Sequence, residues 1–196
     1  MDVLIVGAGG HAGVVFDALV KLERNVIGFL DNDFQKKGQE YCGANVLGPD
    51  TFLDEVNPDN IMLVNGIGHQ GLRKKIQENL EQKGWCFEGF VHPFARVSSL
   101  SVISSDAQIH AGAVVQANVT IGKSVIVNTS AVVDHDCNVG EWSHVGPNAT
   151  LCGSCEIGSM VMIGAGAVLT PNSIVLEGQL IKANTLNGSS SRTLAG

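Results

Sequence analysis

The C-terminal half of the chain carries an apolar pattern that repeats every six residues. From Val91 to Ile181, every sixth residue is aliphatic, over sixteen consecutive positions. The residue four places after each of them is small or β-branched, with Gln179 the one exception. An α-helix repeats every ~3.6 residues and a strand every two, so neither element produces this spacing. The pattern is typical of the hexapeptide repeat of a parallel β-helix.

The repeat also indicates the dimensions of such a β-helix. Each hexad supplies one short strand and one turn, and three hexads close a triangular coil, so residues 18 apart stack on one another. Sixteen hexads make roughly five coils, with a length of ~25 Å at ~4.8 Å per coil. The spacing alone leaves the hand of the coil open.

Residues 1–88 are organised differently, with apolar strands that alternate with helical segments. This alternation predicts βαβ units and a parallel sheet. We therefore expect a Rossmann-like α/β domain over 1–88 and an all-β parallel β-helix over 89–196. The second helix should bury the face that carries Leu72, Ile76 and Leu80. The expected strands cover 2–6, 26–30, 61–65 and 85–90, and the expected helices cover 9–22 and 70–83.

Charge and composition exclude several classes of protein. The net charge is −7 and the longest basic run is the short 73–75, so binding to nucleic acid is not expected. The N-terminus has no cationic leader and the chain has no apolar run of 18 residues. We expect a cytoplasmic protein that does not insert into a membrane. Five cysteines, an odd number, argue against a disulfide framework.

Three cysteines lie within the repeat, and two of them form a Cys-x-x-Cys pair that resembles a metal or redox site. The register argues against that interpretation. Cys155 of the pair Cys152 and Cys155 stands at an inward corner, and Cys137 lies 18 residues earlier, directly below it. Zinc needs four ligands and no second pair is present, so no metal is expected. His92 and His110 each follow a core aliphatic residue, and we expect both on the surface.

His135 is the strongest candidate for a catalytic group. It lies between Asp134 and Asp136, and a carboxylate that is hydrogen-bonded to an imidazole orients the ring and stabilises its charged form. The residues 18 before and 18 after it are Ala117 and Gly153, whose minimal side chains should leave a groove beside the ring. The alternative is a solvated histidine in a turn.

The segment 7–12, Gly-Ala-Gly-Gly-His-Ala, follows a strand and begins a helix. It fits the G-x-G-x-x-A dinucleotide fingerprint, with Asp31 further along the chain. The diphosphate of a nucleotide sugar would use the same backbone amides. An NAD-dependent enzyme is less favoured, because this half has room for about four strands and no separate catalytic domain follows. A turn that needs glycine only for packing is the third possibility.

The segment 128–144, NTSAVVDHDCNVGEWSH, resembles the motif of the bacterial nucleotide-aminosugar acetyltransferases of the hexapeptide-repeat class, the PglD/NeuD-like family. These include UDP-4-amino-sugar N-acetyltransferases and sialic acid O-acetyltransferases. The segments 6–12, 29–32, 67–68 and 73–76 match as well, so the resemblance covers nearly the whole chain. The C-terminal Gly-x-Pro-Ala motif of the family is missing, and the stretch 183–191 reads differently.

The resemblance implies a left-handed β-helix, a homotrimer and acetyl-CoA as co-substrate. It makes His135 the general base and Asp136 the residue that raises its basicity. The other residues that it implicates are His144, Gly153 and Ala165 for acetyl-CoA, and Gly9, Gly10, His11, Asp31, Asn32, Gly68 and Asn128 for the nucleotide sugar.

The function expected from the sequence is acetyl transfer to the amino group of an amino-deoxy sugar linked to UDP, dTDP or GDP, in bacterial surface-glycan biosynthesis. One alternative is O-acetylation of a sialic-acid-like sugar. Another is a non-catalytic β-helix whose α/β domain only binds a nucleotide. The intact Asp-His-Asp sequence at 134–136 favours an enzyme.

Overall fold

The computed structural model describes residues 1–187 and divides the chain into two compact units. The first unit is Met1–His92 and the second begins at Pro93. The boundary expected after residue 88 lies a few residues before this division. Each unit has its own hydrophobic core.

The first unit is built on a five-stranded sheet with the order β3-β4-β2-β1-β5. Every neighbouring pair is parallel except β3 and β4, which form an antiparallel edge. Three of the expected strands are confirmed as β1, β2 and β5 below. The strands are β1 (Asp2–Val6), β2 (Val26–Leu30), β3 (Glu40–Tyr41), β4 (Ala44–Gly48) and β5 (Ile61–Asn65).

The fourth strand expected, over 85–90, is wrong. In this stretch only Phe87 forms a bridge, to Leu63 of β5, while Phe90 begins a strand of a different sheet. Trp85 is buried in the apolar core instead. The fourth parallel strand is β4, whose short sequence Ala-Asn-Val-Leu-Gly carries only a weak strand signal.

Helices cover both faces of this sheet. Val3 and Ile5 of β1 pack with α1 (Gly10–Lys21) on one face, and Leu4 and Val6 pack with α2 (Gln70–Gln82) on the other. This alternation follows from the period of two in a strand. Three 3₁₀ segments complete the unit, η1 (Phe34–Lys36), η2 (Asp50–Glu55) and η3 (Pro58–Asn60).

The face that α2 buries differs from the expected one. Leu80 is buried as predicted, but Leu72 is 48% exposed. The helix buries Arg73 and Gln77 beside Leu80. The Asn65 side-chain amide, at the end of β5, donates to Gln77 Oε1 and to the backbone carbonyl of Arg73. The Arg73 guanidinium donates to the backbone carbonyls of Ile67 and Gly68. At Arg73 and Gln77, hydrogen bonds therefore take the place of the apolar contacts expected for the buried face of α2.

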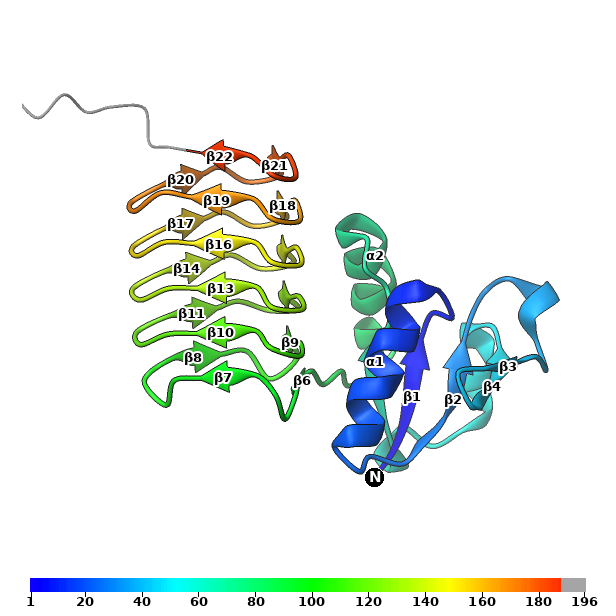
Figure 1. The fold of residues 1–196 in the computed structure, drawn as a ribbon. Helices are drawn as coiled ribbons and strands as arrows, with labels where there is room; N and C mark the ends of the chain where they lie inside the picture. The colour runs from blue at the N-terminus through cyan, green and yellow to red at the C-terminus, as the bar shows by residue number, and fades with distance from the viewer. Residues whose placement is uncertain (188–196) are drawn as a thin grey trace, which may run out of the picture. The chain divides into compact units, whose positions relative to one another are not determined.

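The second unit is a left-handed parallel β-helix made of two-residue strands (Figure 1). Its three sheets have the orders β22-β19-β16-β13-β10-β7, β20-β17-β14-β11-β8 and β21-β18-β15-β12-β9-β6. The strands are β6 (Phe90–Val91), β7 (Arg96–Val97), β8 (Val102–Ile103), β9 (Gln108–Ile109), β10 (Val114–Val115), β11 (Thr120–Ile121), β12 (Ile126–Val127), β13 (Val132–Val133), β14 (Asn138–Val139), β15 (His144–Val145), β16 (Thr150–Leu151), β17 (Glu156–Ile157), β18 (Met162–Ile163), β19 (Val168–Leu169), β20 (Ile174–Val175), β21 (Leu180–Ile181) and β22 (Leu186–Asn187).

Strands pair with a register of 18 residues, as the repeat predicts. Val114 lies opposite Val132, and Ile126 lies opposite His144. The aliphatic positions from 109 to 175 are buried in a single core. At the first position of the series Val91 is 43% exposed, so the expected core residue is wrong there.

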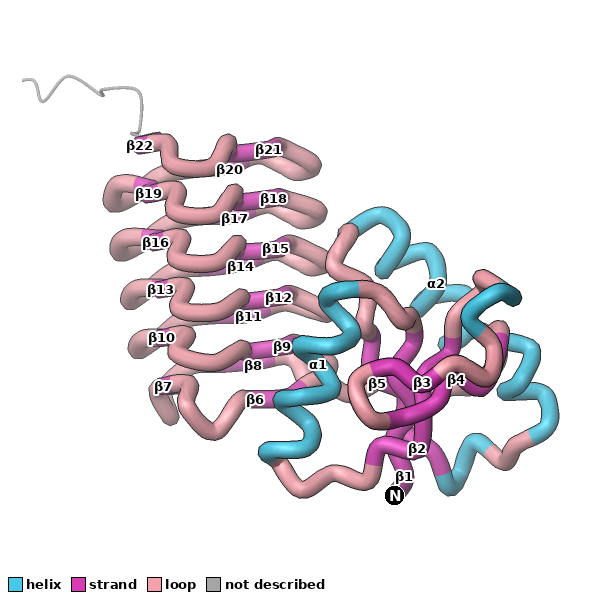
Figure 2. The backbone as a smooth tube through the Cα atoms, turned by 45° about the vertical axis from the view of Figure 1, so that its right-hand side comes forward, coloured by secondary structure: helices cyan, strands magenta, loops and turns pink. Residues whose placement is uncertain are grey.

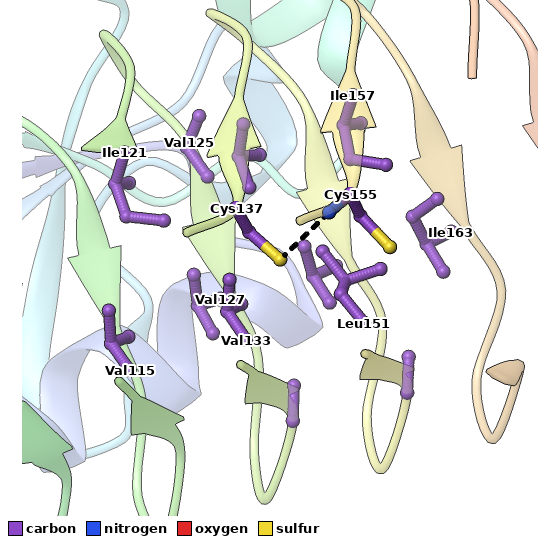
Figure 3. Close-up of a cluster of buried hydrophobic side chains, with 14 of the residues drawn as sticks. Val115, Ile121, Val125, Val127, Val133, Cys137, Leu151, Cys155, Ile157 and Ile163 are labelled. Atoms are coloured by element: carbon purple, nitrogen blue, oxygen red, sulfur yellow. Dashed lines mark hydrogen bonds between the residues drawn. The ribbon is translucent and has the colours of Figure 1, made fainter. Parts of the chain in front are cut away.

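Cys137 and Cys155 lie in this core, as expected (Figure 3). Cys137 and Cys155 are both fully buried, and the Cys155 backbone N–H donates to Cys137 Sγ at 3.3 Å. By contrast, the surface positions expected for His92 and His110 are wrong. The residues are 4% and 1% exposed, and burial lowers the pKa of His92.

The corners of the β-helix turn through left-handed backbone conformations. Loops connect the two-residue strands at the corners of each coil (Figure 2). In every hexad from Gly112 to Asn184, the residue before the small core residue has φ between 50° and 71°. Glycine, asparagine and aspartate tolerate this region best, and a bulky side chain there is uncommon. The residues concerned are Gly112, Asn118, Ser124, Ser130, Asp136, Trp142, Asn148, Ser154, Met160, Gly166, Asn172, Gly178 and Asn184.

Candidate active site

His135 and Asp136 form a hydrogen-bonded pair on the corner that follows β13. His135 Nδ1 lies 2.7 Å from Asp136 Oδ2, and the two side chains are 58% and 49% exposed. Asp134 faces another way, since its Oδ1 accepts from the backbone N–H of His135 at 2.8 Å. One carboxylate thus orients the ring and the other fixes the backbone of the same residue.

The stacked neighbours of His135 are those that the repeat predicts. The Asp136 N–H donates to the Ala117 carbonyl at 3.1 Å, and the Ser154 N–H donates to the His135 carbonyl at 2.9 Å. The imidazole itself lies against Gly153, so the ring occupies the space that this minimal side chain leaves. A Cβ added to Gly153 would be 2.6 Å from His135 Cε1 and 2.7 Å from Nε2.

The charges around His135 favour its protonated form. The hydrogen bond that the ring donates to Asp136 and the nearby charge of Asp134 raise the pKa of His135. The pKa of Asp136 is lowered by its hydrogen bonds with His135 and Asn118. A raised pKa makes the neutral imidazole a stronger base, while Asp136 stays ionised to stabilise the imidazolium.

His144 and Asn128 are in direct contact, although the sequence implicated them with different ligands. His144 begins β15 and Asn128 directly follows the neighbouring strand β12, and the Asn128 Nδ2 lies 2.9 Å from His144 Nε2. His144 is 8% exposed. Ala165 follows β18 in the next coil, where its carbonyl accepts from the Asn184 N–H at 2.9 Å. The end of the segment that departs from the family motif, 188–191, lies outside the described residues.

A cavity of about 460 Å³ opens in the first unit where β1, β2 and β5 end and α1 and α2 begin. The chain leaves β1 for β2 on one side and returns as β5 on the other, so the cavity lies at a topological switch point. Six predicted residues line it. They are Gly9, Gly10, His11, Asp31, Asn32 and Gly68.

The glycines of this cavity fall into two groups, those that packing or backbone conformation requires and those that neither requires. A Cβ on Gly66 would lie 2.7 Å from Ala12 Cβ, and Gly7 has φ +100°, so both meet packing or backbone demands. A Cβ on Gly9 or Gly10 would meet nothing within 4 Å. Packing therefore does not require glycine at these two positions. Gly9 caps α1 without a side chain, and the first turn has no acidic residue, which suits an anion.

Both carboxylate oxygens of Asp31 accept hydrogen bonds from other groups of the protein. Its Oδ2 accepts from the Ala8 N–H at 2.9 Å and from Lys36 Nζ at 2.7 Å, and its Oδ1 accepts from the Asp33 N–H. Burial alone would raise the pKa of Asp31, but the hydrogen bonds from Lys36 and the backbone lower it overall. In a dinucleotide-binding fold, the corresponding carboxylate instead accepts hydrogen bonds from the ribose hydroxyls. The hydrogen bonds of Asp31 therefore favour a role in holding the glycine loop in place over a role in binding NAD.

Three residues outside the set of site residues predicted from the sequence also fix this cavity. Lys36 donates to the Ala8 carbonyl, and the Tyr41 hydroxyl donates to the Gly9 carbonyl at 2.9 Å. Buried Arg73 donates through Nη1 to the Gly68 carbonyl at 2.9 Å. Within the sequence, Arg73 looked like one of three solvated charges, so only its helical position relative to Leu80 could have suggested burial.

Within residues 1–187, no group of three or more His, Cys, Asp and Glu side chains could hold a metal ion. Within the same range, none of the helices has the length and apolarity needed to span a bilayer.

Comparison with known proteins places the chain among sugar-modifying enzymes. Residues 2–80 match the family described as the PglD N-terminal domain. Among curated proteins, no significant match is found.

Several solved structures are similar over nearly the whole chain. The acetyltransferase domain of PglB from Neisseria gonorrhoeae, solved with acetyl coenzyme A, is 31% identical with a TM-score of 0.88, over 96% of this chain and 93% of that one. A variant of perosamine N-acetyltransferase from Caulobacter crescentus, solved with CoA and GDP-perosamine, is 32% identical with a TM-score of 0.74, over 96% and 86%.

WeeI from Acinetobacter baumannii has the same fold, at 22% identity and a TM-score of 0.74, over 99% of this chain and 100% of that one. The PglB domain is 31% identical to this chain over nearly all of both chains, which shows a shared family in addition to a shared fold. The chain therefore belongs to the PglD-like sugar acetyltransferases.

Proposed function

We propose that this protein transfers the acetyl group of acetyl-CoA to the amino group of an amino-deoxy sugar linked to UDP, dTDP or GDP. The observation that carries the proposal is the His135–Asp136 pair, whose exposed ring is bound at Nδ1 and leaves Nε2 to accept a proton. The relatives named above bind acetyl-CoA in one case and CoA with GDP-perosamine in the other.

The reaction follows from the chemistry of this pair. The amino nitrogen of the sugar attacks the carbonyl carbon of the thioester, and His135 Nε2 accepts the proton that the nitrogen loses. The tetrahedral intermediate then re-forms its carbonyl and expels the CoA sulfur, which takes the proton back from the imidazolium. Asp136 stabilises the charged ring between the two proton transfers. A backbone N–H of the β-helix stabilises the oxyanion.

The nucleotide sugar binds in the cavity of the first unit. Its diphosphate lies against the open backbone of Gly9 and Gly10, and His11 contacts it at the start of α1. The base and ribose lie near Asn32 and Gly68, with Asp31 holding the glycine loop in place.

Acetyl-CoA binds along the β-helix. His144 of β15 and Ala165 after β18 lie on stacked coils of one sheet, so an extended pantetheine arm can contact both. Gly153 follows β16 of another sheet and contacts acetyl-CoA beside the His135 ring. Asn128, which is bound to His144, takes part in holding the sugar near the thioester. The protein works as a cytoplasmic homotrimer in bacterial surface-glycan biosynthesis.

Release of free CoA thiol tests the proposal directly. The full-length protein is incubated with acetyl-CoA and a panel of UDP-, dTDP- and GDP-linked amino sugars, together with the matching hydroxyl sugars. We expect thiol release with an amino sugar, and a loss of about 10²- to 10⁴-fold in kcat for His135→Ala. Release only with hydroxyl sugars would make the enzyme an O-acetyltransferase. Nucleotide binding without any release would leave a non-catalytic binding protein.

A further inference from the structure

Asp136 is held at both of its carboxylate oxygens. Oδ2 contacts the ring of His135, and Oδ1 accepts a hydrogen bond from Asn118 Nδ2 at 3.0 Å. Asn118, Asp136 and His135 therefore form a continuous chain of hydrogen bonds that leads to Nε2 of the imidazole. Asn118 was not among the site residues predicted from the sequence.

The fold brings Asn118 and Asp136 together. They occupy the same corner of successive coils, 18 residues apart, and both have left-handed backbone conformations, with φ of 60° and 59°. The backbone holds the two corners in register, because the Asp136 N–H donates to the carbonyl of Ala117, next to Asn118. A side chain at one corner consequently reaches its counterpart on the next coil.

We propose that Asn118 is a positioning residue for the acetyl-transfer reaction, which it serves by holding Asp136 in the rotamer that presents Oδ2 to His135. An exposed carboxylate with one partner can rotate away from it, and the second hydrogen bond restricts that rotation. An amide N–H as donor also favours the ionised form of Asp136, which the imidazolium needs beside it.

The competing explanation is that asparagine stands here only because it tolerates the left-handed corner. Asn172 provides the comparison. It occupies the same corner two coils beyond Asp136, with φ of 62°, and its N–H donates to the Gly153 carbonyl. A purely conformational role would make the two asparagines equivalent in their effect on activity.

Three variants separate these explanations. Asn118→Gly removes the amide and keeps the corner, since glycine occupies the matching position at 112, 166 and 178. Asn118→Asp keeps the size of the side chain and replaces the donor with a second carboxylate. Asn172→Gly is the matched control. Each is measured for kcat against pH, and the His135 ring is titrated by NMR, with His135→Gln identifying its resonance.

We expect Asn118→Gly to lower kcat about threefold to tenfold, the loss that corresponds to one hydrogen bond. Asn118→Asp should lower it further and move both the acid limb of the profile and the His135 titration to higher pH, because an added carboxylate favours the imidazolium. Asn172→Gly should change neither.

An unchanged kcat in Asn118→Gly, or an equal loss in Asn172→Gly, would overturn the proposal. The kinetic test rests on the proposed acetyl transfer, whereas the NMR titration does not. If the wild type transferred no acetyl group, an upward shift of His135 in Asn118→Asp would still support the hydrogen-bonded chain, and the absence of a shift would refute it.

Discussion

His144 Nε2 accepts a hydrogen bond from the side-chain amide of Asn128, with 2.9 Å between the two nitrogens. The Asn128 Oδ1 accepts from the Thr129 N–H at 2.7 Å, which assigns the amide with its NH₂ group toward the ring. An NH₂ group can only donate, so the ring nitrogen that it contacts carries no proton.

This contact predicts that His144 and Asn128 act as one unit in binding acetyl-CoA. His144→Ala and Asn128→Ala should each raise the KM for acetyl-CoA, and the double variant should resemble the worse single one. Residues in direct contact typically couple by ~0.5–3 kcal/mol. Steady-state kinetics of the four proteins measures the coupling, and the pair His144→Ala with Asn172→Gly is the additive control. Additivity between His144 and Asn128 would contradict the prediction.

The two carboxylates beside His135 should differ in their effect on turnover. Asp136 contacts the ring and Asp134 contacts the backbone. Asp136→Asn should therefore lower kcat by about 10- to 100-fold, as loss of an orienting partner does elsewhere. Asp134→Asn keeps an oxygen that can accept the His135 N–H, so its kcat should stay within about threefold of wild type. Equal losses in the two variants would count against the assignment.

The pH dependence of kcat/KM should report the raised pKa of His135. The base acts when neutral, so activity falls as the pH drops through that pKa. The acid limb should lie above ~6.5, the ordinary value of a histidine. In Asp136→Asn the limb should move to lower pH, because the neutral amide no longer favours the imidazolium. A limb that stays in place in this variant would show that another group titrates.

Gly153 and Gly158 should respond to substitution in opposite ways. A Cβ on Gly153 would strike the His135 ring, whereas one on Gly158 would come within 2.6 Å of the Glu177 backbone nitrogen. The His135 side chain can change its rotamer to relieve the contact, whereas the backbone at Glu177 cannot move in this way. Gly153→Ala should thus lower kcat by more than about tenfold with little change in Tm, while Gly158→Ala should lower Tm. Thermal unfolding and CoA release on both variants provide the test.

Gly10 should govern binding of the nucleotide sugar alone. Since a Cβ there meets nothing within 4 Å, Gly10→Leu should fold normally and fill part of the cavity. The KM for the sugar should rise about tenfold or more, with acetyl-CoA affinity nearly unchanged, and His144→Ala should show the reverse. Calorimetric titration with each ligand checks this, and tighter binding of NAD than of any nucleotide sugar would refute it.

The repeat made most of the β-helix predictable from sequence. A period of six fixes which residues face inward and which stack, so the positions of Ala117 and Gly153 around His135 could be foreseen. The repeat does not predict the rotamer of the His135 ring, since a rotamer depends on its local partners. The space beside Gly153, which looked vacant from the sequence, holds the imidazole.

The α/β unit was less predictable because its polar side chains are buried. Arg73 and Gln77 read as solvent-facing residues of an amphipathic helix, yet they support the loop after β5. Lys36 reached Asp31 through a 3₁₀ turn that no periodic pattern marks. Pairings of this kind depend on contacts between segments, which a linear pattern does not encode.

The 18-residue register restricts how the length of this chain can change. Removing one hexad would still leave aliphatic residues facing inward and left-handed corners at regular intervals, so a prism of similar stability could form. Every residue beyond the deletion would, however, rotate to the next of the three sides. A deletion between Asn118 and Asp136 would thereby separate the asparagine from the carboxylate. A whole coil inserted between these two residues would also separate them, because they would then lie two coils apart. The site therefore fixes the length of this stretch, whereas the fold itself tolerates the gain or loss of a third of a coil.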